Sequence, residues 1–249
     1  MTTTTRILVL AALTAAAGSE ARAQTPPQVP PAPPTMGFIN INVGGQIASR
    51  SVGVNENTPL YGETLTVSTS QSVGSGALFD ISGGYRVWRS VSAAIGFSDF
   101  SKTSDASGTA SIPNPLVFDR PVTVNVSQSG LHHSERAVHI MASWLFPVTN
   151  EFDVTFAVGP SVFSAKQEVI SVNVPPGTQS ANASVGSESK SGVGAIVQVD
   201  GNYMLRRKWG AAWGAGAFMR YAGAKVDLPS VPGMKVGGFQ LGVGLRARF

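Results

Sequence analysis

The last fourteen residues of the chain, 236–249, alternate strictly between two kinds of side chain. One face carries Phe239, Leu241, Val243, Leu245, Ala247 and Phe249, and the other carries Gly238, Gln240, Gly242, Gly244, Arg246 and Arg248. A period of two predicts a β-strand. Because one face is apolar and the other is polar or small, the strand suits a closed barrel in lipid, with hydrocarbon outside and a polar lumen inside.

Seven earlier segments show the same alternation. They are residues 37–48, 76–87, 91–102, 134–146, 152–165, 192–205 and 209–222. Together with the last strand they predict an all-β fold, an eight-stranded antiparallel up-and-down transmembrane barrel over residues 36–249. Residues 116–126 and 168–174, which lie in long connections, also alternate, so a count of ten strands stays open.

Composition narrows the choice of fold and partner. No apolar run reaches the roughly 18 residues of a spanning helix, so a membrane-crossing form of this chain has to be a closed barrel. The absence of cysteine excludes a disulfide framework and a thiolate metal site. The formal charge of +4 comes from scattered Lys and Arg residues, whose longest run is 206–208, and we therefore expect no nucleic-acid partner.

The connections between the predicted strands alternate in length. Residues 88–90, 147–151 and 206–208 are short, whereas residues 49–75, 103–133, 166–191 and 223–235 are long. Short connections at one end and long loops at the other are typical of outer-membrane barrels, in which the short ones face the periplasm. An even number of strands then leaves both termini in the periplasm.

Alternation alone does not decide which face points outward, because lipocalin-like soluble barrels keep their apolar face inside. Two features favour lipid outside. The second face consists largely of small residues, as the narrow lumen of an eight-stranded barrel requires. Aromatic residues also lie beside the short connections or the chain end, which predicts an interfacial girdle: Tyr85, Trp88, Trp144, Phe146, Phe152, Tyr203, Trp209 and Phe249.

The last strand resembles the closing strand of bacterial outer-membrane β-barrels, and the whole pattern is similar to the small porin-like OmpA/OmpX-type group. The resemblance implies that the barrel-assembly machinery recognises the C-terminal strand through Phe249. It also implies an outer-membrane location, contact with outer-membrane lipid and lipopolysaccharide, a monomer, no cofactor and no enzymatic activity.

The first residues predict export from the cytoplasm. Arg6 precedes an apolar segment, 7–17, and Ala21-Arg22-Ala23 offers the small-x-small pattern of a signal-peptidase site. We expect residues 1–23 to be a signal peptide that is cleaved after Ala23. Residues 24–35 contain six prolines and predict an extended periplasmic linker.

Six charged residues are predicted to face the lumen, where they have to be paired or hydrated. They are Asp80, Arg86, Asp153, Asp200, Arg246 and Arg248. We expect Asp153 and Asp200 to pair with Arg246, Arg248 or Arg86 near the periplasmic end and to form a structural plug. The alternative is a gate in a narrow ion path.

The three histidines, His132, His133 and His139, lie close together in the sequence. His132 and Ser134 share a strand face on the lipid side and resemble the His-x-Ser pair of outer-membrane lipid A deacylases. Residues 136–150 contain no Asp or Glu to orient the histidine. A two-histidine metal site would lack a third ligand, and His139 is predicted to fill the lumen. We expect no metal site.

The sequence therefore predicts a non-enzymatic outer-membrane barrel. Its role would be structural or surface interaction through four long polar loops, with at most a narrow or gated pore. Two alternatives remain open at this point. One is a lipid A-modifying acyl hydrolase that uses His132 and Ser134, and the other is an exported soluble lipocalin-like barrel that binds a ligand.

Overall fold

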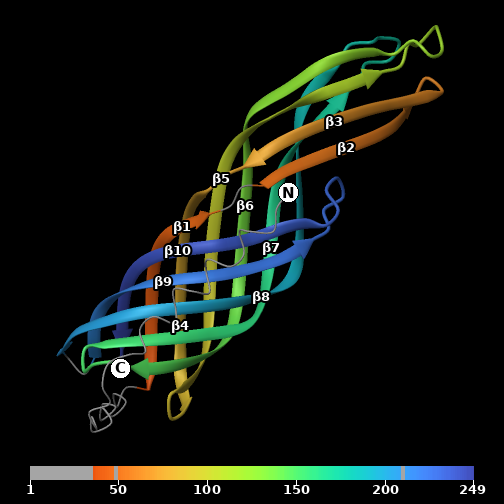
Figure 1. The fold of residues 1–249 in the computed structure, drawn as a ribbon. Helices are drawn as coiled ribbons and strands as arrows, with labels where there is room; N and C mark the ends of the chain where they lie inside the picture. Colours follow the sequence, from red (N-terminus) through yellow and green to blue (C-terminus); the bar gives the residue numbers. More distant parts are fainter. Residues whose placement is uncertain (1–35, 48–49, 209–210) are drawn as a thin grey trace, which may run out of the picture.

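The computed structural model describes residues 36–47, 50–208 and 211–249, so the predicted signal peptide and linker lie outside the described residues. Figure 1 shows a long, tilted sheet structure. The strands are β1 (Gly37–Ile47), β2 (Arg50–Leu60), β3 (Glu63–Val73), β4 (Gly76–Trp88), β5 (Val91–Ile112), β6 (Val122–Pro147), β7 (Phe152–Asn173), β8 (Asn182–Lys208), β9 (Ala211–Val226) and β10 (Met234–Arg248). No helix long and apolar enough to cross a membrane occurs among the described residues.

Eight of the strands form a closed antiparallel ring. The order around the ring is β1, β4, β5, β6, β7, β8, β9 and β10, and β10 pairs again with β1. At this seam Val43 lies opposite Val243 and Ile41 opposite Leu245. The predicted eight-stranded barrel is confirmed, and its closure removes the edge strands that an open sheet would expose.

The other two strands explain why a count of ten stayed open. β2 and β3 form a hairpin inside the first long connection, and β3 pairs with the outer half of β5, from Thr66 opposite Ser111 to Gln71 opposite Ala106. β5 to β8 have 22, 26, 22 and 27 residues, whereas about 9–11 residues cross a bilayer. Their outer parts and the hairpin form a projection beyond the ring (Figure 1), which we call the arm (residues 51–73, 103–131 and 168–187).

The arm corrects the prediction of long polar loops. Residues 103–133 and 166–191 are mostly strand, with turns only around 113–121 and 174–181. The arm has its own apolar core, in which Leu65 and Val67 of β3, Ala110 and Ile112 of β5 and Val126 of β6 are buried together. Val172 of β7 packs against this cluster, so the hairpin of β7 and β8 covers one face of the sheet formed by β2, β3, β5 and β6.

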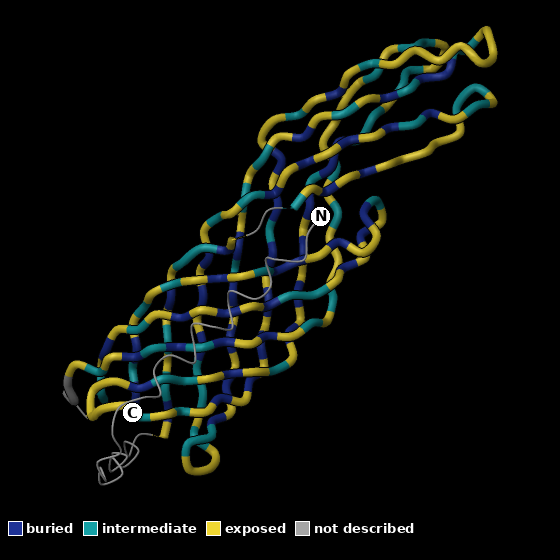
Figure 2. Tube along the Cα trace, viewed as in Figure 1, coloured by how far each residue is buried: buried dark blue, intermediate teal, exposed yellow. Residues whose placement is uncertain are grey.

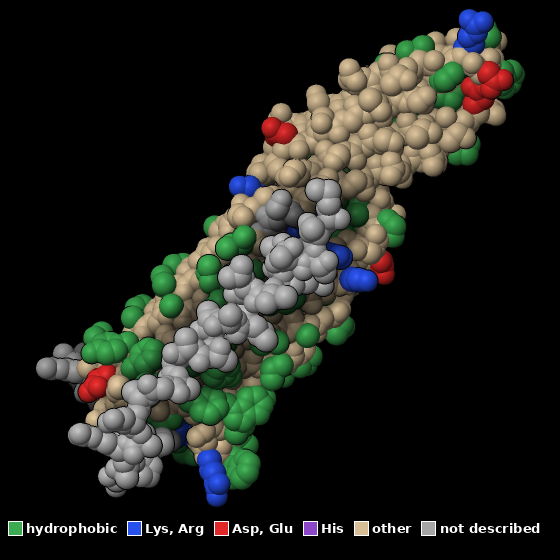
Figure 3. Space-filling model, viewed as in Figure 1, with side chains coloured by type: hydrophobic (Ala, Val, Ile, Leu, Met, Phe, Trp, Pro, Cys, Tyr) green, Lys and Arg blue, Asp and Glu red, His purple; other side chains and the backbone are tan. Residues whose placement is uncertain are grey.

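The barrel exposes apolar side chains and buries polar ones. Val43 and Val243 are each 60% exposed on the outside, whereas Asn42, Asp80 and Arg246 are buried inside. Buried and exposed residues alternate along every ring strand in Figure 2, and hydrophobic side chains gather over the barrel rather than the arm in Figure 3. A soluble lipocalin-like barrel has the opposite arrangement, so the fold is that of a transmembrane β-barrel.

The seam between β1 and β10 depends on a close backbone approach at Gly44. A Cβ added there would lie 2.0 Å from the carbonyl oxygen of Leu241. We expect Gly44→Val to lower the free energy of unfolding by about 1–3 kcal/mol or to prevent closure, because the strands cannot move apart without breaking the hydrogen bonds between them. Heat-dependent mobility on detergent gels measures the folded fraction. Gly53→Val in β2, where no atom lies within 4 Å of the added Cβ, should fold normally; equal loss in both variants would contradict the prediction.

Candidate functional site

The lumen is filled by one continuous network of side-chain hydrogen bonds, which we call the lumen chain. It runs from the C-terminal end of the barrel into the arm through Arg248, Asp153, Asn202, Arg246, Asn42, Asp80, Arg220, Gln240, Gln46, Glu135, His133, Gln167 and Gln71. All are buried. Because the strands alternate, every second side chain reaches this interior, and polar groups there must satisfy one another.

Two of the carboxylates that the sequence placed inside lie at the start of the lumen chain, Asp153 as a member and Asp200 beside it. Asp153 of β7 accepts two hydrogen bonds from Arg248 of β10, one of them at 2.7 Å. Asp200 of β8 forms a 3.4 Å ion pair with Arg246, whose Nε also donates to Asn202 at 2.6 Å. Both ion pairs therefore lie near the end of the barrel that carries the chain terminus.

A third buried pair occupies the middle of the barrel. The guanidinium of Arg220 in β9 lies 2.6 Å from the carboxylate of Asp80 in β4 and also donates to Gln240. Asn42 donates to the same carboxylate at 2.7 Å. Sequence analysis did not include Arg220 in the charge network. β4 and β9 are not neighbours in the ring, and strand alternation does not reveal contacts across the lumen.

A fourth cluster closes the lumen chain where the arm begins. Glu135 of β6 accepts hydrogen bonds from Arg50 at 2.6 Å, from Gln46 at 3.2 Å and from the backbone N–H of Gly237 at 2.6 Å. It also lies 2.7 Å from Nε2 of His133. Sequence analysis singled out none of these residues as site residues. The sequence pattern that could have revealed part of the cluster is the spacing of His133 and Glu135. They are two positions apart and therefore share the lumen face of β6.

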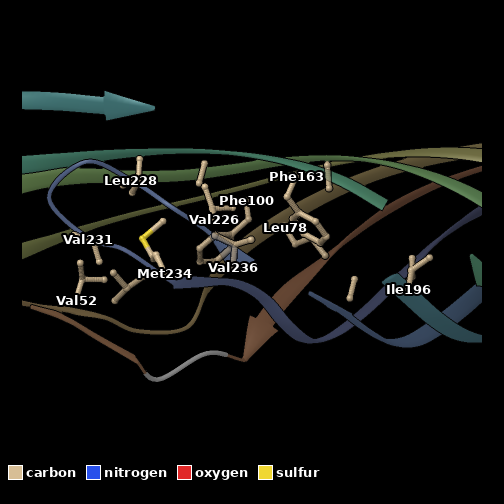
Figure 4. Packing of buried hydrophobic residues seen from close by; sticks show 14 of the residues in the cluster. Val52, Leu78, Phe100, Phe163, Ile196, Val226, Leu228, Val231, Met234 and Val236 are labelled. Atoms are coloured by element: carbon tan, nitrogen blue, oxygen red, sulfur yellow. The ribbon is translucent and has the colours of Figure 1, made fainter. Parts of the chain in front are cut away.

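An apolar layer lies at the same end of the lumen, which the sequence predicted only to be polar. Leu228 and Val231, from the connection between β9 and β10, are buried with Val52 of the arm hairpin and with Phe100 and Phe163 of the barrel wall. Figure 4 shows Leu228, Val231, Met234 and Val52 grouped on one side of Phe100. Phe100 and Phe163 point inward because the mouth is covered and therefore needs no polar lining.

The opposite end of the lumen holds a small cavity of about 50 Å³. Arg86 lines it together with Arg248, Asp200, Ser143 and Thr155. The sequence assigned Arg86 to the lumen charge network, and its place is this cavity. About 10–15 Å³ of such space holds one water molecule, so the cavity has room for a few waters.

His132 and Ser134, the pair on which the hydrolase alternative depends, lie on the surface of the protein. His132 is exposed and Ser134 is partly exposed, on the outer face of β6. A carboxylate from a sequence-distant part of the chain, that of Glu168 in β7, lies beside His132. It accepts a hydrogen bond from the backbone N–H of His132 at 2.7 Å and therefore does not orient the imidazole ring. Within the described ranges, no hydrogen bond joins the His132 ring to the Ser134 hydroxyl, and no group of three or more His, Asp or Glu side chains is placed to hold a metal ion.

The aromatic residues predicted for the girdle face outward at the end of the barrel opposite the arm. The exposed members are Tyr85, Trp88, Trp144, Phe146, Phe152, Tyr203 and Phe249. Phe152 lies directly opposite Tyr203, and the rings of Phe146 and Phe156 pack edge to face at 5.7 Å. Trp209 lies outside the described residues.

No protein-family model matches the chain, and no curated protein matches it. Among solved structures it is similar to the outer-membrane protein OprG of Pseudomonas aeruginosa (10% identity, 86% of this chain and 96% of that chain, TM-score 0.45). It is also similar to Neisserial surface protein A (11%, 86% and 97%, 0.40) and to the outer-membrane protease OmpT of Escherichia coli (8%, 85% and 97%, 0.43). At these identities the likeness is one of architecture and carries no activity over to this chain.

The Asp80–Arg220 pair should dominate the stability of the barrel interior. Asp80→Asn leaves the guanidinium of Arg220 buried without its counter-charge, and we expect the free energy of unfolding to fall by about 3–5 kcal/mol. The double variant Asp80→Asn/Arg220→Met removes both charges and should lose less than the single variant. Urea unfolding in lipid vesicles, followed by tryptophan fluorescence, measures both.

The matched control is the ion pair between Asp99 and Arg136 on the outer surface, whose side chains are 39% and 70% exposed. Because water screens this pair, Asp99→Asn should change the free energy of unfolding by less than about 1 kcal/mol. A loss for Asp80→Asn no larger than that of Asp99→Asn would contradict the role assigned to the lumen chain.

Proposed function

We propose that this protein is an integral outer-membrane β-barrel that anchors the arm at the cell surface as an interaction element and does not act as an open pore or an enzyme. One observation carries the proposal. The lumen chain and the apolar layer occupy the barrel interior and leave a small cavity at the end opposite the arm, whereas the arm is a folded structure with its own core. An interior held shut by paired charges supports an anchor, and a folded projection supports recognition.

The orientation follows from the connections between strands. The short turns, including 147–151 and the one after Trp88, lie at the end opposite the arm, and short turns face the periplasm in such barrels. The arm then extends outside the cell. The apolar belt would contact outer-membrane lipid and lipopolysaccharide, and we propose that the assembly machinery reads the strand that ends at Phe249. A monomer suffices for the closed ring.

The orientation predicts which positions a reagent reaches in living cells. The natural sequence contains no cysteine, so single cysteines report without background. We expect Ser127→Cys, exposed on the arm, to react with a membrane-impermeant maleimide on intact cells. Asn150→Cys, exposed in a short turn, should react only after the outer membrane is permeabilised. If Asn150→Cys is labelled in intact cells and Ser127→Cys is not, the arm lies in the periplasm. That result would contradict the proposed function.

The sealed lumen predicts that the purified protein carries no steady ionic current in planar bilayers. Three buried arginine–carboxylate pairs lie in the path, and moving ions past them requires separating charges in a medium of low dielectric constant. Insertion is checked by heat-dependent mobility of protein recovered from the same vesicles, and an open porin serves as the positive control. Discrete, reproducible channels that disappear in Arg246→Ala would show a gated path instead of a plug.

A further inference from the structure

The free end of the arm carries three exposed apolar side chains. The connection between β5 and β6 leaves Leu116 90%, Val117 51% and Phe118 69% exposed, and we call these residues the tip triplet. Hydrophobic side chains also appear at the outer end of the arm in Figure 3, far from those that cover the barrel. The membrane belt therefore does not account for the tip triplet. Contiguous apolar surface exposed to water is typical of an interaction site.

The backbone of the tip triplet is held in place by other parts of the arm. The side-chain oxygen of Asn114 accepts the N–H of Leu116 at 2.8 Å and that of Val117 at 3.1 Å. The amide of Asn114 donates to Gln179 in the connection between β7 and β8 at 3.3 Å. On the other side, Glu63 of the hairpin accepts the N–H of Asp119 at 2.6 Å.

The turn between β2 and β3 is hydrogen-bonded to the connection between β7 and β8. The hydroxyl of Tyr61, in the turn between β2 and β3, donates to the carbonyl of Pro175 at 3.1 Å and accepts the N–H of Thr178 at 3.2 Å. All three connections of the arm thus form one head. A side chain presented on such a fixed backbone loses less conformational entropy on binding than one on a free loop.

The arm is acidic although the chain as a whole is basic. Residues 51–73, 103–131 and 168–187 contain Glu56, Glu63, Asp105, Asp119 and Glu168 against a single base, Arg120, which gives five negative charges, one positive charge and a net of −4. The whole chain has a formal charge of +4. Glu63, Asp119 and the base Arg120 lie next to the tip triplet, so acidic groups outnumber basic ones beside it.

We propose that the tip triplet inserts into an apolar pocket bordered by Lys or Arg on a partner protein. This rests on the proposed function, because it requires the arm to lie outside the cell. Aromatic and aliphatic anchors in a desolvated pocket supply most of the affinity of such contacts, and a basic border complements the acidic arm. An anionic bilayer would be repelled by the arm, and a second copy would bring two acidic arms together.

The test uses random twelve-residue peptides displayed on phage and selected on the full chain in phosphatidylcholine nanodiscs. We expect reproducible enrichment of peptides that combine aromatic or aliphatic residues with Lys or Arg. Synthetic versions should bind Leu116→Ser/Phe118→Ser at least tenfold more weakly than the unaltered chain. They should bind more weakly as salt is raised, because part of the attraction is between charges.

The matched control is Val185→Ser, at an apolar position on β8 of the arm that is 48% exposed and lies outside the tip triplet. Its affinity for the same peptides should stay within twofold of the unaltered chain, and all variants are first shown to fold by heat-dependent mobility. Failure to enrich peptides, enrichment of acidic ones, or equal binding by the tip variant would overturn the proposal.

Two further measurements decide between occupants. Flotation with phosphatidylcholine/phosphatidylglycerol vesicles that depended on Phe118 would replace the protein partner by a bilayer, and a Phe118-dependent dimer in light scattering would replace it by a second copy. Maleimide labelling of Ser127→Cys tests the outward position of the arm separately. The proposed function can therefore fail while peptide binding still stands, and the reverse also holds.

Discussion

Pairing of buried charges inside the barrel is the condition on which this structure depends. A narrow lumen surrounded by hydrocarbon has a low dielectric constant, so an unpaired arginine or carboxylate there would cost several kcal/mol. Asp80 and Arg220 are 140 positions apart in the sequence and meet only when the ring is closed. The ion pairs and the closed barrel therefore require each other. Closure of the ring brings the two partners together, and their pairing offsets the cost of burying charges inside the ring.

The two parts of the molecule follow opposite rules because they meet different solvents. In the barrel, Val43 and Val243 face outward and Asn42 and Arg246 are buried. In the arm, Leu65 and other apolar residues are buried and the outer surface is largely serine, threonine and asparagine. The polarity reverses within single strands such as β5 and β6, near the level where Glu135, Arg50 and His133 form their cluster.

The sequence was sufficient to predict the barrel because its signal is local. An apolar residue at every second position locates a lipid-facing strand without knowledge of its neighbours, and all eight predicted segments correspond to ring strands. The arm strands were partly missed for a related reason. Segments such as 103–112 place serine, threonine and aspartate on one face and mostly small residues, alanine, glycine and serine, on the other, a contrast too weak to separate from a polar loop.

The contacts of the site were less accessible to sequence reasoning. The inward direction of Asp153, Asp200, Arg246 and Arg248 followed from strand period, but the choice of partner depends on the stagger between strands, which no single strand encodes. Arg220 illustrates this, because its counter-ion comes from across the lumen. The tip triplet was hidden for another reason: exposure of residues 116–118 depends on three connections that come together only in the folded arm.

The strands β5 to β8 pass from the barrel into the arm without a break in their assignment. At roughly 3.3 Å per residue, the 26 residues of β6 extend over about 85 Å, several times the height of the hydrocarbon layer that they cross. The one irregularity between β5 and β6 lies where they enter the arm, at a bulge between Ser104 and Ala106, and a bulge bends the strand that contains it. The length of these continuous strands therefore sets how far the arm projects from the barrel, and the bulge sets the direction in which it leans.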